Sequence, residues 1–123
     1  MILVRALIVA AGGTLGVALR MLLGLAIPDA AGIPVSVLVA NVLGAFLLGV
    51  LTARLPAAVL RLFLGTGILG GFTTYSSFMV GTAELWVTQP LLAAGYALGS
   101  LALGIVAAAV GLHLFRREPG VAR

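Results

Sequence analysis

The chain has 123 residues, of which 63% are hydrophobic and only 8% charged, and its mean hydropathy is +1.30. A soluble globular domain carries about 25% charged residues, so this composition excludes a soluble fold and matches a protein whose surface faces a lipid bilayer. The net charge of +4 comes from seven arginines, which lie in short connections, near the chain ends and, for Arg20 alone, inside the first apolar stretch. That placement is typical of a membrane protein and gives no reason to expect nucleic acid as a partner.

Four apolar stretches, each long enough to cross a hydrocarbon core of about 30 Å, are separated by polar and proline-bearing connections. We expect transmembrane helices at about 2–27, 33–52, 60–86 and 91–115. The first stretch is interpreted as an uncleaved span, because it is longer than a signal-peptide core and three more spans follow it. The sequence thus predicts a single all-α membrane domain, 1–123, whose short connections make neighbouring helices antiparallel.

Seventeen glycines indicate how these helices pack. A glycine costs about 1 kcal/mol inside a soluble helix, but between membrane helices it lets two backbones approach closely. Gly12 and Gly16 form a GxxxG pair in the first stretch, and Gly95 and Gly99 repeat the spacing in the fourth. We expect these surfaces to pack against other helices or against a second copy of the chain.

The segment 70–78 (GGFTTYSSF) carries the strongest polar signal within the apolar stretches. Two glycines beside two threonines make a poor continuous helix, so the third helix is predicted to break at mid-membrane depth. Irregular backbone at that depth must be buried in protein or line a cavity, and its freed carbonyls are good ligands for a hard cation. The alternative is a simple kink, in which Thr and Ser hydroxyls bond those carbonyls.

Other polar groups inside the spans are candidate site residues, because an unpaired polar group in hydrocarbon is costly. Asn41 either bonds a neighbouring helix or offers an amide N–H to an anion. Tyr75 and Phe78 share a helix face on which ring edges meet an anion or simply pack. Tyr96 and Ser100, one turn apart, either line the same path or bond neighbouring helices.

Arg20 lies within the first stretch, near its far end. Its guanidinium either extends to the membrane interface or supplies positive potential at an anion vestibule. The other arginines all fall on one side of a four-span topology: Arg5, Arg54, Arg61, Arg116, Arg117 and Arg123. The positive-inside rule then predicts that both termini are cytoplasmic.

Three segments in order resemble the signatures of the Fluc/CrcB fluoride channels: 12–20 (GGTLGVALR), 41–49 (NVLGAFLLG) and 70–78 (GGFTTYSSF). Length and span number match as well, so the resemblance covers nearly the whole chain. It implies an antiparallel, dual-topology dimer in the cytoplasmic membrane. Such a protein is not an enzyme but a passive, selective channel that exports fluoride and lowers its intracellular concentration.

The resemblance also implies roles for individual residues. The fluoride path would be lined by Asn41, Tyr75, Ser76, Ser77, Phe78, Tyr96 and Ser100. A structural Na⁺, which is not transported, would be held at the dimer axis by the backbone carbonyls of Gly70 and Thr73 from each subunit. This chain departs from the family pattern at Tyr75, where phenylalanine is usual, and at Val37 and Gly104, where hydroxyl residues are common.

The partner in such a dimer is either a second copy or an oppositely oriented paralogue. An antiparallel homodimer needs copies inserted both ways, whereas the arginines favour one orientation. Two other classes of function stay open from the residues. A small four-helix multidrug exporter needs a membrane-embedded carboxylate, and the first stretch has no acid. A non-transporting assembly subunit would require neither Asn41 nor a break near residues 70–78.

Overall fold

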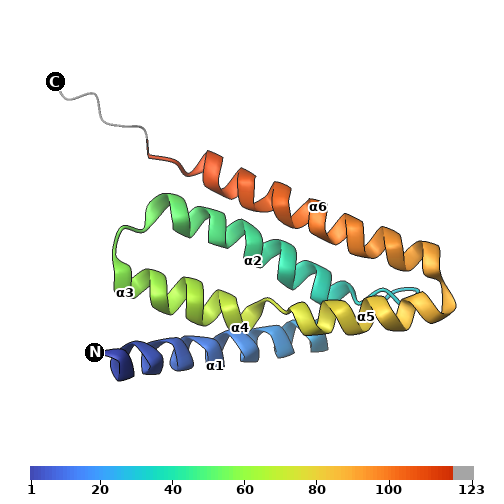
Figure 1. The fold of residues 1–123 in the computed structure, drawn as a ribbon, viewed down its shortest axis with the longest axis horizontal. Coiled ribbons are helices and arrows are strands. Elements are labelled where there is room, and N and C mark those ends of the chain that lie inside the picture. Colours follow the sequence, from blue (N-terminus) through green and yellow to red (C-terminus); the bar gives the residue numbers. More distant parts are fainter. Residues whose placement is uncertain (118–123) are drawn as a thin grey trace.

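The computed structural model describes residues 1–117 as helices joined by short connections (Figure 1). The helices are α1 (Ile2–Ala26), α2 (Val35–Arg54), α3 (Ala58–Arg61), the π-helix η1 (Leu62–Leu69), α4 (Gly70–Phe72), α5 (Tyr75–Thr88) and α6 (Pro90–Leu114). The segments from α3 to α5 follow one another as a single long rod, so four rods run along the molecule. Within the described range, these 4 rods are long and apolar enough to cross a membrane, and the chain is a multi-pass membrane protein.

The predicted spans agree with the observed rods to within two residues at each end. The second helix begins at Val35 rather than at residue 33, because the chain first makes a tight turn. Ala31 and Gly32 both have positive φ angles, of 53° and 83°, and Ala30 pairs with Ile33 through two backbone hydrogen bonds. Pro34 is the residue that caps the start of this helix.

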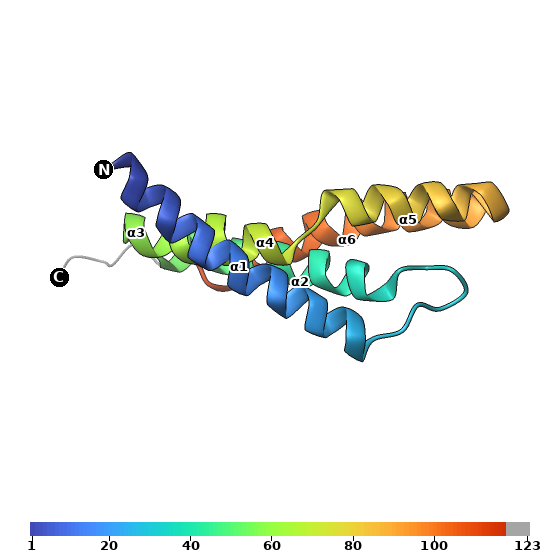
Figure 2. The ribbon, with the colours of Figure 1, turned by 90° about the horizontal axis from the view of Figure 1, so that it is seen from below.

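Glycines bring α1 into backbone contact with η1 and α4. Figure 2 shows α1 crossing the third rod near α4. A Cβ atom added to Gly12 would lie 2.9 Å from the Cα atom of Gly67. One added to Gly16 would collide with the backbone of Ile68 and lie 2.8 Å from the Phe72 nitrogen. The prediction that Gly12 and Gly16 form a packing surface is confirmed.

A second glycine contact joins α2 and α6. Added Cβ atoms would bring Gly49 against the backbone of Ala108, and Gly111 against the backbone of Phe46. These two helices therefore also touch backbone to backbone over part of their length, as expected for small residues at a membrane helix interface.

Other glycines of α6 have no such neighbour. Nothing among the described residues lies within 4 Å of a Cβ atom built on Gly95, Gly99 or Gly104. The GxxxG pair at Gly95 and Gly99 is thus not a packing surface within this chain. The other alternative, contact with a second copy of the chain, stays a prediction.

The third rod departs twice from α-helical geometry. Over Leu62–Leu69 it is π-helical, which the sequence had not indicated. At Thr73 (φ −79°, ψ 155°) and Thr74 (φ −148°, ψ 119°) the backbone is extended, and α5 then begins at Tyr75. Figure 1 shows this as the thin connection between α4 and α5. Two half-helices thus meet at a short non-helical step.

Charge is distributed unequally between the two ends of the molecule. The start of α1, the connection between α2 and α3 and the end of α6 lie at one end, opposite the connections at 27–34 and between α5 and α6 (Figures 1 and 2). The first end carries the arginines Arg5, Arg54, Arg61, Arg116 and Arg117, whereas Asp29 and Glu84 lie toward the other. Arg123 lies outside the described residues.

Candidate functional site

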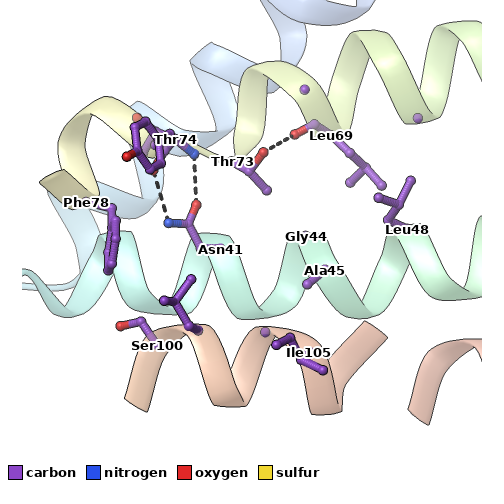
Figure 3. Close-up of a pocket in the computed structure, with 15 residues that line it drawn as sticks. Asn41, Gly44, Ala45, Leu48, Leu69, Thr73, Thr74, Phe78, Ser100 and Ile105 are labelled. Atoms are coloured by element: carbon purple, nitrogen blue, oxygen red, sulfur yellow. Dashed lines mark hydrogen bonds between the residues drawn. The ribbon is translucent and has the colours of Figure 1, made fainter. Parts of the chain in front are cut away.

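A groove of about 480 Å³ runs beside the non-helical step, between α2, the third rod and α6 (Figure 3). Its lining residues are Asn41, Gly44, Ala45, Leu48, Gly65, Leu69, Gly70, Thr73, Thr74, Tyr75, Phe78, Ser100, Leu101, Gly104 and Ile105. The set includes most of the site residues predicted from the sequence, although they come from three different helices. The groove is apolar along most of its length, with polar groups concentrated near Asn41 and the step.

Asn41 is hydrogen-bonded to both polar groups of the Thr74 backbone. Its Nδ2 donates to the Thr74 carbonyl oxygen at 3.1 Å, and its Oδ1 accepts from the Thr74 N–H at 2.8 Å (Figure 3). This network defines which side-chain atom is nitrogen and which is oxygen. These bonds use one of the two Nδ2 protons, and Asn41 lines the groove. The amide therefore joins two helices and still has a donor for a ligand, so the two predicted alternatives are compatible.

Arg20 of α1 contacts the same region from the opposite side. Its Nε donates to the Gly71 carbonyl oxygen at 3.4 Å, and the side chain is half-buried. Gly71 lies near the C-terminal end of the first half-helix, where a positive charge is favourable because the last carbonyls point outward. The sequence predicted that Arg20 either extends to the membrane interface or lies at an anion vestibule. Neither prediction included a bond to the backbone of another helix.

Hydroxyl groups start the second half-helix. The Thr74 Oγ1 accepts from the Ser77 N–H at 3.2 Å and so caps α5. It also donates to the Ser77 Oγ at 3.1 Å and lies 3.2 Å from the Ser76 Oγ. The Thr73 Oγ1 donates to the carbonyl oxygen of Leu69, which already accepts from the Thr73 N–H. The hydroxyls of Thr74, Ser76 and Ser77 are therefore bonded mainly to one another and to the Ser77 N–H. The Thr73 hydroxyl is bonded to a backbone carbonyl of its own helix.

Two carbonyls at the step have lost their α-helical donors. In a continuous helix, the Gly70 oxygen would accept from the Thr74 N–H, and the Thr73 oxygen from the Ser77 N–H. The first donor is bonded to Asn41 and the second to the Thr74 hydroxyl. Gly70 and Thr73 both line the groove. Uncommitted carbonyl oxygens are the ligands that hard cations prefer, so these residues fit the cation site that the family resemblance implies.

The aromatic residues lie along one side of the step. Phe78 is buried, with its ring centroid 5.6 Å from that of Tyr96 and 6.3 Å from that of Tyr75. Tyr75 itself is 75% exposed. The Tyr96 hydroxyl and the Ser100 Oγ are buried without a hydrogen-bond partner in residues 1–117. Buried hydroxyls are rarely left unpaired, so both have capacity for a ligand or water.

Sequence reasoning assigned no individual role to Thr74 or Gly71. Thr74 combines a helix cap with the partnership to Asn41, and Gly71 accepts from Arg20. The cap had a local signal, because threonine is a preferred residue before the first turn of a helix. The contact of Gly71 with α1 had none.

Four spans, an interrupted third rod and a polar groove beside the interruption define a small multi-pass membrane protein with a site inside its helix bundle. The family model described as CrcB-like protein, Camphor Resistance (CrcB), matches residues 7–112. This is most of the chain, and the protein belongs to the CrcB-like family.

Several curated relatives are similar over nearly their whole length. The chain is 44% identical over 118 residues to the fluoride-specific ion channel FluC 2 of Leifsonia xyli, covering 88% of this chain and 81% of the relative. It is 43% identical over 117 residues to the fluoride-specific ion channel FluC of Agrobacterium fabrum, covering 89% and 94%. For a protein of the same name from Thermus thermophilus, the identity is 46% over 121 residues, covering 89% and 94%.

Proposed function

We propose that this protein is a fluoride-selective, passive channel that exports fluoride across the cytoplasmic membrane. The observation that carries the proposal is the groove, in which an amide, an aromatic ring and a hydroxyl from three helices lie together. These groups are Asn41, Phe78 and Ser100. The names of the relatives supply the ion. Family membership leaves the multidrug-exporter alternative without support.

Selectivity for a small, strongly hydrated anion requires protein groups that replace its water. The free Nδ2 proton of Asn41, the unpartnered hydroxyls of Tyr96 and Ser100, and the positive ring edge of Phe78 are suitable donors. A negative-inside membrane potential drives an anion outward by about 2.3 kcal/mol per 100 mV for each charge. Export of fluoride down this potential needs no further energy source.

Two features support assembly into an antiparallel dimer. The groove is open along one side of the single chain, and the α6 glycines Gly95, Gly99 and Gly104 have no close neighbour in it. A second subunit would cover the groove and give each anion path a second wall. In such a dimer, the carbonyls of Gly70 and Thr73 from both subunits would hold a structural Na⁺. The step at Thr73 lies in the middle of the Ala58–Thr88 rod, which supports a site at mid-membrane depth.

The distribution of charge supports one dominant orientation, with both termini cytoplasmic. All the arginines of the described chain except Arg20 are at the end where α1 begins and α6 finishes. An antiparallel complex would then need a partner inserted the other way, and we favour an oppositely oriented paralogue over a second copy.

The experiment that tests this function is ion efflux from proteoliposomes containing the purified chain, with fluoride and chloride measured in parallel. We expect fast loss of fluoride without loss of chloride. Asn41→Asp, which removes the amide donor, and Phe78→Ile, which removes the ring, should each abolish the flux. Thr82→Val is the matched control, because its hydroxyl bonds only the Phe78 carbonyl one turn earlier in the same helix.

The same assay separates the possible partners. Flux from the chain alone would show that a homodimer suffices. Flux that requires co-reconstitution with a paralogue would establish the heteromeric channel. Equal permeation of fluoride and chloride, or no fluoride flux with any paralogue present, would refute the proposed function.

A further inference from the structure

We infer that Asn41 and Arg20 are positioning residues that determine which carbonyls at the step between α4 and α5 are free to hold a cation. The inference rests on the cation site of the proposed function. It goes beyond that site, because it assigns the geometry of the ligands to two side chains that are not ligands themselves.

Asn41 and Arg20 have opposite effects on the hydrogen bonding of two neighbouring carbonyl oxygens. Asn41 accepts the Thr74 N–H that would otherwise bond the Gly70 oxygen, and so leaves that oxygen without its helical donor. Arg20 instead provides a donor to the Gly71 oxygen. Gly70 lines the groove, whereas a Cβ atom added to Gly71 would collide with the backbone of α1. The Gly70 oxygen thus lacks its helical donor in a residue that lines the groove, whereas the Gly71 oxygen is bonded to α1.

Asn41 also stabilises the second half of the step. Its Nδ2 donates to the Thr74 carbonyl, so both polar groups of this peptide are held by α2. Gly44, one turn later on α2, faces the Thr73 side chain so closely that an added Cβ atom would overlap the methyl group. Thr73, whose carbonyl would be the second cation ligand, is therefore packed between α2 and the Thr74 peptide that Asn41 holds in place.

Loss of either side chain would change this arrangement in a definite direction. A buried N–H needs an acceptor, and without Asn41 the nearest helical acceptor for Thr74 is the Gly70 oxygen. The first half-helix would then extend by one residue and consume a cation ligand. Without Arg20, the Gly71 oxygen would lose its partner, and the end of the half-helix would be free to rotate.

The test is the Na⁺ dependence of thermal unfolding for the purified protein in detergent, followed by circular dichroism. Na⁺ is titrated against N-methylglucamine at constant ionic strength. A cation that binds only the folded protein raises the unfolding midpoint with concentration. For Asn41→Leu and Arg20→Gln we expect the midpoint to begin to rise only at an Na⁺ concentration about tenfold higher than in the unsubstituted protein, which corresponds to a coupling of about 1.4 kcal/mol.

Thr82→Val is again the matched control, because it removes a hydroxyl on α5 that bonds its own helix and not the step. Its unfolding midpoint in the absence of Na⁺ is free to shift, but the Na⁺ concentration at which the midpoint begins to rise should not. A merely structural role for Asn41 and Arg20 would lower the midpoint and leave the Na⁺ concentration unchanged, and that result would overturn the inference. If Asn41→Leu does not fold, Arg20→Gln still decides, since it removes one long hydrogen bond from a half-buried side chain.

Absence of the cation site itself would give a different result in the Na⁺ titration. The titration is therefore made on the assembly that conducts fluoride in the efflux assay, whether this chain alone or the chain with its paralogue. If that assembly shows no response to Na⁺, the structural cation is wrong and the inference falls with it. Fluoride efflux is scored separately and does not depend on this titration. The channel assignment and the role of the two positioning residues are therefore tested by different measurements.

Discussion

Replacing Gly16 with alanine tests whether backbone contact between α1 and the third rod sets the position of Arg20. The new methyl group would lie 2.8 Å from the Phe72 nitrogen and 2.9 Å from the Ile68 carbonyl carbon. Real Cβ atoms essentially never approach within 3.0 Å, and backbone cannot move aside like a flexible side chain. The two helices must therefore separate by a few tenths of an ångström or more.

That separation has a calculable cost. Overpacking of this kind costs about 1–3 kcal/mol, and the better helix propensity of alanine offsets at most about 1 kcal/mol of it. The same shift would carry the 3.4 Å contact between Arg20 and the Gly71 oxygen beyond hydrogen-bond range. We expect Gly16→Ala to lower the free energy of unfolding by about 1–2 kcal/mol.

The assay is unfolding by SDS in mixed micelles, followed by circular dichroism. Gly13→Ala is the matched control on the same helix, because its methyl group would lie 3.9 Å from the nearest atom, the Gly67 oxygen, at ordinary contact distance. Its stability should be unchanged or slightly higher. If Gly13→Ala and Gly16→Ala unfold at the same SDS fraction, close backbone packing does not fix the position of α1.

Two further predictions concern the cap of α5 and the orientation of the chain. Thr74→Val keeps the shape of the side chain but removes the oxygen that accepts from the Ser77 N–H. It should lower the free energy of unfolding by about 1 kcal/mol in the SDS assay. No change would show that the cap is replaced by water or by Ser76. Reporter fusions at the C-terminus should be overwhelmingly cytoplasmic, and equal inward and outward populations would contradict a fixed orientation.

The positions of the spans could be predicted from the sequence, because long apolar stretches bounded by polar residues are a local signal. The π-helical stretch Leu62–Leu69 could not. Its run of leucine and glycine is compatible with either helical geometry, and its backbone lies against α1, where Gly67 meets Gly12. Contacts with a distant segment therefore select π-helical rather than α-helical geometry here, because the local sequence favours neither form strongly.

Glycine spacing shows the same limit more sharply. Gly12 and Gly16 have the same four-residue separation as Gly95 and Gly99, so the sequence treats the two pairs alike. In the structure, the first pair touches the backbone of another helix, whereas no neighbouring helix in residues 1–117 lies within 4 Å of a Cβ atom built on either glycine of the second pair. The pattern identifies surfaces suited to close approach, but the partner depends on how the helices are arranged.

The candidate site was predictable as a set of residues but not as a network. Motif resemblance grouped Asn41 with the step, yet the Asn41–Thr74 bonds join residues 33 positions apart, and the Arg20–Gly71 bond joins residues 51 apart. No spacing rule within one helix reports such contacts. Composition gave reasons for each polar group to find a partner, and only the fold identifies which partner each one has.

The double bonding of Asn41 changes how its variants must be interpreted. The amide holds the Thr74 peptide and also lines the groove, so in the proposed channel the same side chain would serve both the step and the anion path. Loss of fluoride flux in Asn41→Asp therefore does not by itself place Asn41 on the path, because displacement of Gly70 and Thr73 would also stop transport. Arg20 separates the two effects, since it bonds the step at Gly71 and is not among the residues that line the groove. If Arg20→Gln weakens the response to Na⁺ and retains fluoride flux, the flux lost in Asn41→Asp is due to the amide proton itself.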